Sequence, residues 1–322
     1  MAKILIIGAG LSGLVAAREL KSRGHEVVVV DKGKGIGGRM ATRRAGGATF
    51  DHGAQFFTVR SAEFQSEVAA WQQAGVAQKW FDGFPSPDNK KPNDHYPRYR
   101  GAAGMTGIGK WLARDLDVCL GEEIESLGRD KNGWTARSVL GREYFGEQLL
   151  LTCPLPQSLK LFDSSGQTLP AAMEGVLRRV SFEPCFAVLA ILKSAGKIPF
   201  PGALYVNKEP LAWMADNFQK GVSAQEGAIT IHSTGAFAKA HYDADENEVG
   251  KTLIDAAREY SEMDVASFQV RRWRYAKPEN PLDIGVAFVP ELNVCFAGDA
   301  LNGGKIEGAF LSGLMAAGVL GS

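Results

Sequence analysis

The segment from Ile4 to Asp31 constrains the fold more than any other part of the chain. An apolar run stops at the glycine turn Gly8-Ala9-Gly10-Leu11-Ser12-Gly13, a helical segment follows, and a second apolar run ends in Asp31. The spacing G-x-G-x-x-G is a weak signal alone, but here a strand precedes it, a helix follows it, and an acid lies eighteen residues past Gly13. The segment therefore predicts a complete βαβ unit that binds a dinucleotide.

The three glycines of this turn have separate tasks. Gly8 permits the tight turn out of the strand, Gly10 lets the backbone approach a diphosphate, and Gly13 allows the helix to pack closely on the strand. Phosphates placed there meet unpaired N–H groups and the positive end of the helix dipole. Asp31 is expected to accept hydrogen bonds from ribose hydroxyls.

A glycine-rich loop, residues 32–40, follows Asp31. It holds too much glycine for a helix or a strand, and it interleaves Lys32, Lys34 and Arg39 among backbone N–H groups. Both kinds of group attract anions. The loop is therefore expected to contact the cofactor, with a flexible connector as the alternative.

Composition argues against several classes of function. The 322 residues carry 36 basic and 36 acidic side chains, so a net charge of zero gives no electrostatic footprint for nucleic acid or for an anionic membrane. No run approaches the roughly eighteen apolar residues that span a bilayer. The histidines lack the spacing of metal ligands, so no metal is expected. Four scattered cysteines are expected to be reduced in a cytoplasmic protein: Cys119, Cys153, Cys185 and Cys295.

Length and pattern indicate two interleaved domains. We expect a cofactor-binding domain from residues 1–60, 101–157 and 284–322, and a substrate domain from residues 61–100 and 158–283. Apolar spacing predicts helices over residues 61–78, 106–114, 155–163, 246–262 and 308–319. Alternation and turns predict a meander over 122–127, 133–139 and 142–151, and strands over 184–192, 203–207, 211–217, 227–233 and 294–297. The proline-rich stretch 85–100 is expected to be irregular.

A second cofactor-facing segment lies near the C-terminus. The strand 294–297 ends at Gly298-Asp299, and after a loop Glu307-Gly308-Ala309 opens a helix of small residues. Asp299 is expected to bond the ribitol or the diphosphate, and the positive end of the helix to face the pyrimidine ring of a flavin. Because the two segments lie at opposite ends of the chain, FAD, which is long and held extended, is favoured over NAD.

Four segments together resemble the renalase group of flavoproteins, which is related to the amine oxidases. They are the N-terminal unit, the Gly37-Gly38-Arg39-Met40 loop, the run Asp51-His52-Gly53-Ala54-Gln55-Phe56-Phe57-Thr58, and the terminal Gly298-Asp299 with Glu307-Gly308-Ala309. The chain is most similar to bacterial members of the pseudomonad type. The resemblance implies an α/β fold: a Rossmann-like FAD-binding domain of the amine oxidase and glutathione reductase type, interleaved with a smaller α+β substrate domain on a mixed sheet.

The motifs and the resemblance together indicate which residues bind FAD. No Cys or His is marked for covalent attachment, so noncovalent binding is expected. The residues expected to contact the cofactor are Gly8, Gly10, Leu11, Ser12, Gly13, Asp31, Lys32, Gly38, Arg39, Met40, Gly53, Ala54, Gln55, Phe56, Ile124, Gly298, Asp299, Glu307, Gly308 and Ala309.

The resemblance also implies an oxidase of misreduced nicotinamide dinucleotides. Its substrates are the 2- and 6-dihydro isomers of NAD(P), which return to NAD(P)⁺ while O₂ is reduced to hydrogen peroxide. Hydride transfer from a dihydropyridine leaves an aromatic pyridinium, so no protein nucleophile or strong base is required. Catalysis then depends on orienting the substrate ring over the flavin, and no catalytic side chain is expected.

A dinucleotide substrate needs contacts to its phosphates and to its ring. Arg98 is the first choice for the phosphates and Tyr96 for a ring contact, with a solvated loop as the alternative. The wall between cofactor and substrate is expected to include Phe57, Thr58 and Arg60.

Three further residues have open assignments. Trp273 and Tyr275 share one face of a strand, directed either to the flavin or into the core, and His232 is either a polar contact to the nicotinamide or a core histidine. A flavin amine oxidase is the first alternative function, because Trp273 and Tyr275 could form an aromatic cage for an amine. A flavin-binding carrier without turnover is the second.

Overall fold

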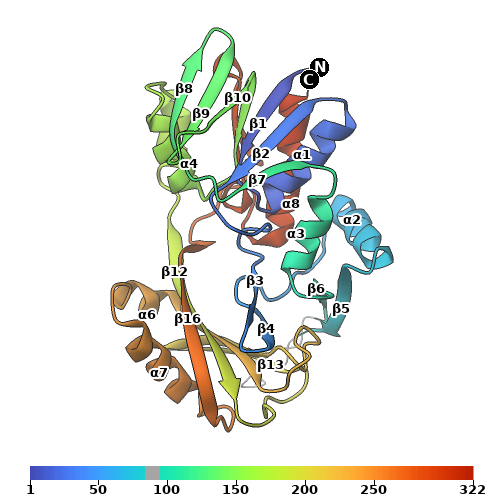
Figure 1. Ribbon diagram of the computed structural model, residues 1–322, viewed down its shortest axis with the longest axis vertical. Coiled ribbons are helices and arrows are strands. Elements are labelled where there is room, and N and C mark those ends of the chain that lie inside the picture. Colours follow the sequence, from blue (N-terminus) through green and yellow to red (C-terminus); the bar gives the residue numbers. More distant parts are fainter. Residues whose placement is uncertain (84–94, 322) are drawn as a thin grey trace.

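The computed structural model describes residues 1–83 and 95–321. Figure 1 shows two halves, with both chain termini at the far end of one half and two long strands, β12 (Phe182–Leu192) and β16 (Val265–Pro278), running through the other. The chain crosses between the halves several times. The predicted α/β fold with a Rossmann-like domain is confirmed.

The first half is built on a six-stranded sheet. Its strand order is β17 (Val286–Val289), β18 (Val294–Ala297), β11 (Gln148–Leu151), β1 (Lys3–Ile7), β2 (Glu26–Asp31) and β7 (Asp117–Leu120). All neighbours are parallel except β17 and β18. The central strands are continuous apolar runs because both faces of the sheet are covered.

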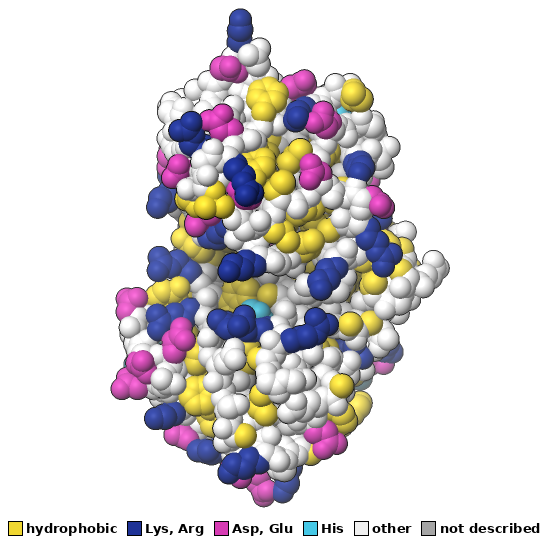
Figure 2. All heavy atoms as spheres, viewed as in Figure 1, with side chains coloured by type: hydrophobic (Ala, Val, Ile, Leu, Met, Phe, Trp, Pro, Cys, Tyr) yellow, Lys and Arg dark blue, Asp and Glu magenta, His cyan; other side chains and the backbone are white. Residues whose placement is uncertain are grey.

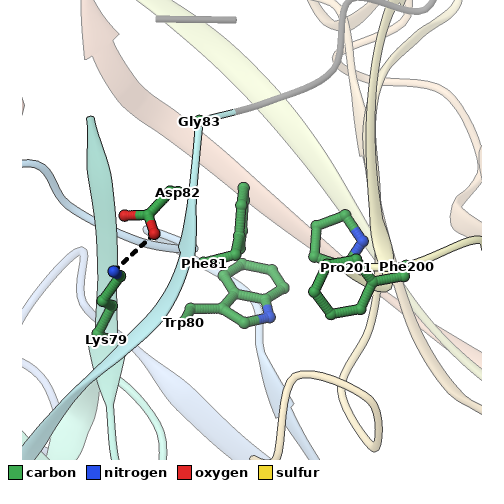
Figure 3. A pocket seen from close by; sticks show the side chains of 7 residues that line it. All are labelled: Lys79, Trp80, Phe81, Asp82, Gly83, Phe200 and Pro201. Carbon is green, nitrogen blue, oxygen red and sulfur yellow. Dashed lines mark ion pairs between the residues drawn. The ribbon is translucent and has the colours of Figure 1, made fainter. Parts of the chain in front are cut away.

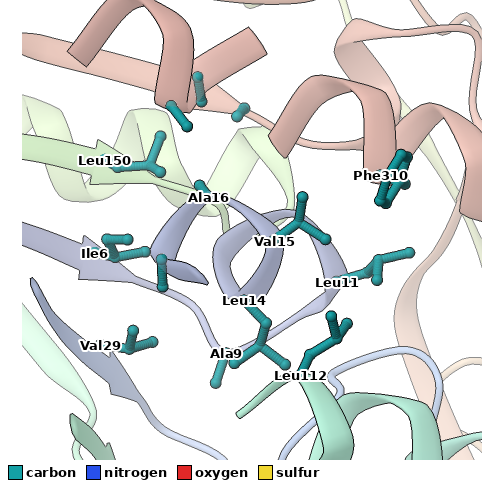
Figure 4. Close-up of a cluster of buried hydrophobic side chains, with 14 of the residues drawn as sticks. Ile6, Ala9, Leu11, Leu14, Val15, Ala16, Val29, Leu112, Leu150 and Phe310 are labelled. Atoms are coloured by element: carbon teal, nitrogen blue, oxygen red, sulfur yellow. The ribbon is translucent and has the colours of Figure 1, made fainter. Parts of the chain in front are cut away.

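Helices cover one face of this sheet, and a small antiparallel sheet covers the other. The helices are α1 (Leu11–Ser22), α3 (Thr106–Leu112) and α8 (Lys305–Leu320), with α2 (Ala62–Gln73) packed against α8. Figure 4 shows Ile6, Val29 and Leu150 of the sheet beside Leu14 and Val15 of α1. The other face packs against the meander β8 (Ile124–Asp130), β9 (Gly133–Ser138) and β10 (Glu143–Gly146), and against α4 (Leu155–Asp163) and α5 (Ala171–Leu177).

The second half is built on an antiparallel five-stranded sheet. Its order is β13 (Ala203–Lys208), β14 (Leu211–Asp216), β15 (Ala228–Ser233), β12 and β16. Helices α6 (Gly235–Ala240) and α7 (Glu246–Ala257) cover one face. The hairpin β3 (Thr42–Ala45) and β4 (Ala48–Asp51) reaches from the first half onto the other face, where Phe50 packs against Leu189. The six-stranded sheet is mixed, whereas this sheet is antiparallel throughout.

Most predicted elements are confirmed, with informative differences. The meander exists, but the segment 142–151 divides at Gly146, and its second part, β11, joins the six-stranded sheet. The helix predicted to reach residue 78 ends at Gln73, because Gly75 adopts φ +69° and the chain continues as β5 (Ala77–Asp82). The prediction that 85–100 is irregular is wrong for β6 (Pro97–Gly101), which pairs with β5 and has its proline at the first strand position. Residues 84–94 lie outside the described residues.

Candidate cofactor and substrate site

The glycine turn forms an open cradle at the carboxyl end of β1. Gly8 adopts φ +118°, and a Cβ on Gly13 would lie 2.0 Å from the carbonyl oxygen of Gly8, so only glycine fits there. A Cβ on Gly10 would meet nothing within 4 Å. No described side chain caps α1, which begins with Leu11 and Ser12. The space over Gly10 and the uncapped N–H groups fit a diphosphate.

Asp31 ties the end of β2 to this turn. Its two carboxylate oxygens accept hydrogen bonds from the backbone N–H groups of Ala9 and Gly33, each at 2.6 Å. A carboxylate has about four lone-pair positions, so two remain for ribose hydroxyls. The next residue, Lys32, is exposed. Backbone hydrogen bonds from residues 121 and 122 to this segment bring Ile124, at the start of β8, to the same edge of the sheet.

The loop after β2 passes directly over the turn. The backbone N–H of residue 37 donates to Ala9 O, and a Cβ on Gly38, which adopts φ +55°, would lie 3.2 Å from Gly10 Cα. Arg39 then donates two hydrogen bonds to Asp299, at 2.8 and 2.6 Å. Met40 is buried in the core. The loop and the C-terminal strand end, 260 residues apart, are thereby joined.

The C-terminal segment meets the same edge because β18 and β1 are both parallel members of one sheet. Gly298 adopts φ +148°, and the Asp299 side chain is mostly buried. Helix α8 begins at Lys305 without a described side-chain cap, Gly308 packs against Asn302, and Ala309 O accepts a hydrogen bond from Ser12 Oγ. The Glu307 carboxylate accepts from the backbone N–H groups of residues 60 and 61, which holds the start of α2.

Residues 51–55 connect the two halves. Asp51 and Lys220 form an ion pair of 2.7 Å in which neither side chain is exposed to solvent. Burial lowers the pKa of Lys220, and the neighbouring Asp51 charge opposes that effect. Gly53 and Ala54 pack against the Arg39 carbonyl, and the buried Gln55 amide donates to Asp51 O at 2.7 Å.

A row of side chains crosses the five-stranded sheet on the face that meets this segment. The strand register pairs Tyr205 with Trp213, Trp213 with His232, His232 with Ala187, and Ala187 with Arg271. Trp273 follows Arg271 on the same face, because side chains two positions apart in a strand point the same way. We call Tyr205, Trp213, His232 and Trp273 the aromatic wall.

His52 links the wall to the cofactor edge. Its carbonyl oxygen accepts hydrogen bonds from Trp273 Nε1 at 3.0 Å and from His232 Nε2 at 3.1 Å. Its ring stacks on Trp273 with centroids 5.3 Å apart. The Nδ1 atom of His52 is buried and has no hydrogen-bond partner among the described residues.

Both imidazoles of the site stay neutral at physiological pH. Burial, together with the charges of Arg271 and Arg43, lowers the pKa of His52 to about 4, against the opposing effect of Asp51. Burial likewise lowers the pKa of His232 to about 4. Figure 2 shows a hollow at the waist of the molecule, with a histidine at its floor and Lys and Arg side chains on both sides.

The predicted substrate residues fall into three places. Phe57 lies in the core on Tyr99, whereas its neighbour Phe56, a predicted cofactor contact, packs against Trp213 of the aromatic wall with ring centroids 5.7 Å apart. Thr58 follows in the loop that leads to α2. Arg98 is buried, lies 5.5 Å from the Phe56 ring centroid and donates to the Tyr96 carbonyl.

The remaining predicted residues lie at the margins of this region. The Arg60 guanidinium lies 5.2 Å from the ring centroid of Tyr96, which is exposed. Trp273 faces His52, while Tyr275 packs edge-on against Phe182, so the two residues of the same strand face have different partners.

Sequence reasoning missed His52, Trp213, Lys220, Arg43 and Arg271 as members of the site. His52 lies inside the D-H-G-A-Q-F-F-T run, so its motif was a usable signal. The other four have no local signal, because the strand register and the position of the β3–β4 hairpin decide where their side chains lie.

All four cysteines are free, and burial raises the pKa values of Cys153 and Cys185 to about 12, which keeps these thiols protonated. In the part of the chain that the structure describes, no three His, Cys, Asp or Glu residues are placed to hold a metal ion. Within the same residues, no helix has the length and apolar character needed to cross a bilayer.

Figure 3 shows a separate open pocket of about 560 Å³ between β5 and the loop before β13. It is lined by Lys79, Trp80, Phe81, Asp82, Gly83, Phe200 and Pro201. None of the residues predicted to bind cofactor or substrate lines it. Trp80 connects it to the buried ion pair, since Lys220 Nζ lies 5.2 Å from the Trp80 ring centroid.

Two family models match consecutive parts of the chain. The NAD(P)-binding Rossmann-like domain matches residues 6–69, and the flavin containing amine oxidoreductase model matches residues 87–320. Among curated proteins, the 4,4'-diapophytoene desaturase of Staphylococcus aureus strain Newman is 49% identical over 51 residues, which are 16% of this chain and 10% of that protein. The chain thus matches about a tenth of the length of that relative.

Solved structures match over nearly the whole chain. Putrescine oxidase bound to putrescine superposes with a TM-score of 0.72 at 14% identity, covering 99% of this chain and 98% of that one. The cyclohexylamine oxidase of Brevibacterium oxydans IH-35A has a TM-score of 0.70 at 16% identity with the same coverage. A candidate protoporphyrinogen oxidase from Exiguobacterium sp. 255-15 has a TM-score of 0.74 at 11% identity, again with the same coverage. At these identities the likeness concerns the fold.

Proposed function

The chain belongs to the flavin containing amine oxidoreductase family, and from that premise we propose that it oxidises the 2- and 6-dihydro isomers of NAD(P) to NAD(P)⁺, in the manner of the renalases. The cofactor is FAD. When bound, it supplies the hydride acceptor and passes the electrons to O₂, which gives hydrogen peroxide. The open cradle over Gly10 and the uncapped N-termini of α1 and α8 fit this cofactor.

One observation carries the proposal: beside the aromatic wall lies a buried His52 Nδ1 that has no hydrogen-bond partner among the described residues, and the imidazoles of His52 and His232 are neutral. A dihydronicotinamide ring needs a flat surface for stacking and a hydrogen-bond partner for its carboxamide. The stacked rings of His52 and Trp273 provide the surface, and His52 Nδ1 provides the partner. Loss of a hydride makes the substrate ring aromatic, so no side chain must take a proton.

Hydrogen bonds to the His52 carbonyl hold His52, Trp273 and His232 in fixed positions. The His52 carbonyl uses both lone pairs, one for Trp273 Nε1 and one for His232 Nε2. His232 therefore carries its proton on Nε2 and acts as a positioning residue for the stacked pair. In this arrangement the protein binds and orients the substrate, and it excludes water from the buried ring faces.

Oxidation of an amine is the second candidate function. Phe56, Trp213 and Tyr205 present their rings to one another with centroids 4.8 to 6.3 Å apart. Such a cluster suits the alkyl part of a neutral amine, and the fold is shared with putrescine and cyclohexylamine oxidases. The two candidates differ in substrate, and a direct test separates them.

The test mixes the FAD-loaded protein without oxygen with 2- and 6-dihydro-NAD(P), and separately with primary and secondary amines, while the oxidised flavin absorbance is followed. We expect rapid bleaching by the dihydro isomers and hydrogen peroxide after air is admitted. Bleaching by amines alone would overturn the proposal in favour of an amine oxidase. Bleaching by neither class would indicate a flavin-binding protein without this turnover.

A variant tests the role of His52. His52→Phe keeps an aromatic ring on Trp273 but removes Nδ1, so the dihydro isomers should bind about tenfold more weakly while the limiting rate of bleaching changes less. His241→Phe, at the end of α6, is the matched control. Equal binding by His52→Phe and the parent protein would exclude the carboxamide contact.

A further inference from the structure

Two arginines lie near the aromatic wall, and each charge acts on the other electrostatically. Arg271 lies on β16, two positions before Trp273 and on the same face of the sheet, across from Ala187 and His232. Arg43 lies on β3, opposite Phe50, which packs onto that face. Both charges act on the imidazole of His52, so both lie close to the site.

These two positive charges have no acidic partner in the part of the chain that the structure describes. Among the described residues, no carboxylate forms an ion pair with Arg43 or Arg271. Arg271 donates one hydrogen bond, from Nη2 to Gln269 Oε1, and its Nε is buried without a partner. Glu246, the acid that acts on Arg271, is paired with Arg272 at 3.6 Å.

The arrangement is costly unless an anion joins it. Burial and the charge of Arg43 both lower the pKa of Arg271, so the protein holds the half-buried Arg271 near a second, exposed positive charge. An anion placed between them relieves the repulsion and accepts hydrogen bonds from two guanidinium groups. Guanidinium groups match phosphate oxygens in pairs, which a lysine in the same place does not.

We propose that Arg43 and Arg271 form a phosphoanion subsite that binds the diphosphate of the dinucleotide substrate. The inference rests on the proposed function, because it assigns the other end of the same substrate. A ring stacked at His52 and Trp273 is separated from its diphosphate by one ribose, and the arginines border that stacked pair. The phosphates of FAD have their own place at the N-terminus of α1, so the two diphosphates occupy different sites.

This assignment differs from the expectation for Arg98. Arg98 is 6% exposed, donates to the Tyr96 carbonyl and lies against the Phe56 ring. Its contacts therefore hold Phe56, which packs on the aromatic wall. Arg43 is exposed, and Arg271 is half-buried.

The primary test measures binding of ADP to the FAD-loaded protein by calorimetry. ADP carries the diphosphate but no nicotinamide, and the resident FAD blocks the cofactor site. Arg43→Met and Arg271→Met should each weaken ADP binding about 10- to 100-fold, as expected for loss of hydrogen bonds to a charged group. Arg274→Met is the matched control, because Arg274 lies on the opposite face of the same strand beside Tyr242 and should bind ADP like the parent.

A second measurement keeps this inference separate from the proposed function. Anaerobic bleaching is compared for a 6-dihydro-NAD isomer and for the corresponding riboside, which lacks phosphate. In Arg43→Gln and Arg271→Gln, the preference for dinucleotide over riboside should fall about tenfold, and retained flavin absorbance shows that the variants fold.

ADP binding that is unchanged in both arginine variants, or weakened equally in Arg274→Met, would overturn the subsite. Bleaching by neither dihydronicotinamide compound, together with ADP binding that depends on Arg43 and Arg271, would support the subsite while overturning the proposed function.

Discussion

The ion pair between Lys220 and Asp51 joins two segments 169 positions apart in the chain. Neither side chain is exposed to solvent, so each charge depends on the other for compensation. Asp51 also accepts hydrogen bonds from Thr42 Oγ1 and from the backbone N–H of Met105. The network ties the β4 strand, the helix α3 region and the turn after β14 together. Its members therefore position the neighbouring His52 and Gln55.

Lys220→Met should cost about 3 to 5 kcal/mol of unfolding free energy, because it leaves the Asp51 carboxylate buried without its counter-charge. The measurement is denaturant unfolding of the FAD-loaded protein. In the double variant Lys220→Met with Asp51→Asn, most of the loss should return, since no uncompensated charge remains. A loss below about 1 kcal/mol for Lys220→Met would contradict the buried pair.

The His232 imidazole makes stability depend on pH. Its pKa in the folded state is about 4, below the ordinary 6.5, so between these values the unfolded chain binds a proton that the folded protein excludes. The free energy of unfolding should therefore fall as the pH drops from 6.5 towards 4. Above pH 6.5 the His232 imidazole should have no effect on it. His232→Gln should make the fall shallower, measured by unfolding at pH 7.5 and pH 5.

The reference for this pH effect is the slope of the parent protein, measured under the same conditions. An identical slope for His232→Gln and the parent would show that His232 is not held neutral by the fold.

At the scale of single elements, two glycines at the start of α1 are expected to have different roles, one in folding and one in cofactor binding. Gly13 touches the Gly8 carbonyl, whereas Gly10 faces open space. Gly13→Ala should destabilise the protein with or without FAD, because a Cβ 2.0 Å from a backbone oxygen forces the helix away from β1. Gly10→Ala should change the stability of the FAD-free protein by less than about 1 kcal/mol but weaken FAD binding at least about tenfold.

Thermal unfolding of the FAD-free variants and flavin retention on dialysis distinguish these two effects. Full flavin retention by Gly10→Ala would mean that the diphosphate does not pass over this residue.

Strand β16 shows how one element serves two surfaces. Val270 is buried beneath α7 on one face, while Arg271 and Trp273 on the other face border His52. The alternation of basic and aromatic residues was visible in the sequence. The sequence did not show which face of β16 lies against the site, because a shift of one residue in strand register exchanges the two faces.

At the scale of the whole molecule, zero net charge coexists with a local concentration of positive charge. A dinucleotide with two phosphate charges should therefore bleach the flavin with a second-order rate constant that falls about three- to tenfold between about 20 and 500 mM NaCl. Since the net charge is zero, such a salt effect must come from the local field of the site. The uncharged riboside is the control and should show little change; a flat response for both compounds would contradict local steering.

Much of the cofactor half could be predicted, and much of the substrate half could not. The ends of β1, β2 and β18 lie at one edge of one sheet because parallel strands place their carboxyl ends together, and their motifs are contiguous. The predicted division into two domains and the individual cofactor and substrate contacts stay predictions. The phosphate role expected for Arg98 passes, in our proposal, to Arg43 and Arg271, which no motif marked.

The sequence by itself determined the dinucleotide cradle, because its strand, turn, helix and closing acid follow one another within 31 residues and obey local rules of backbone and capping. Only the tertiary structure decided that the aromatic wall, Arg271 and His52 come together. Trp213, His232 and Arg271 come from three strands, and His52 from the end of a hairpin that starts in the other half. Their meeting depends on strand register and long-range packing, which no local pattern of residues encodes.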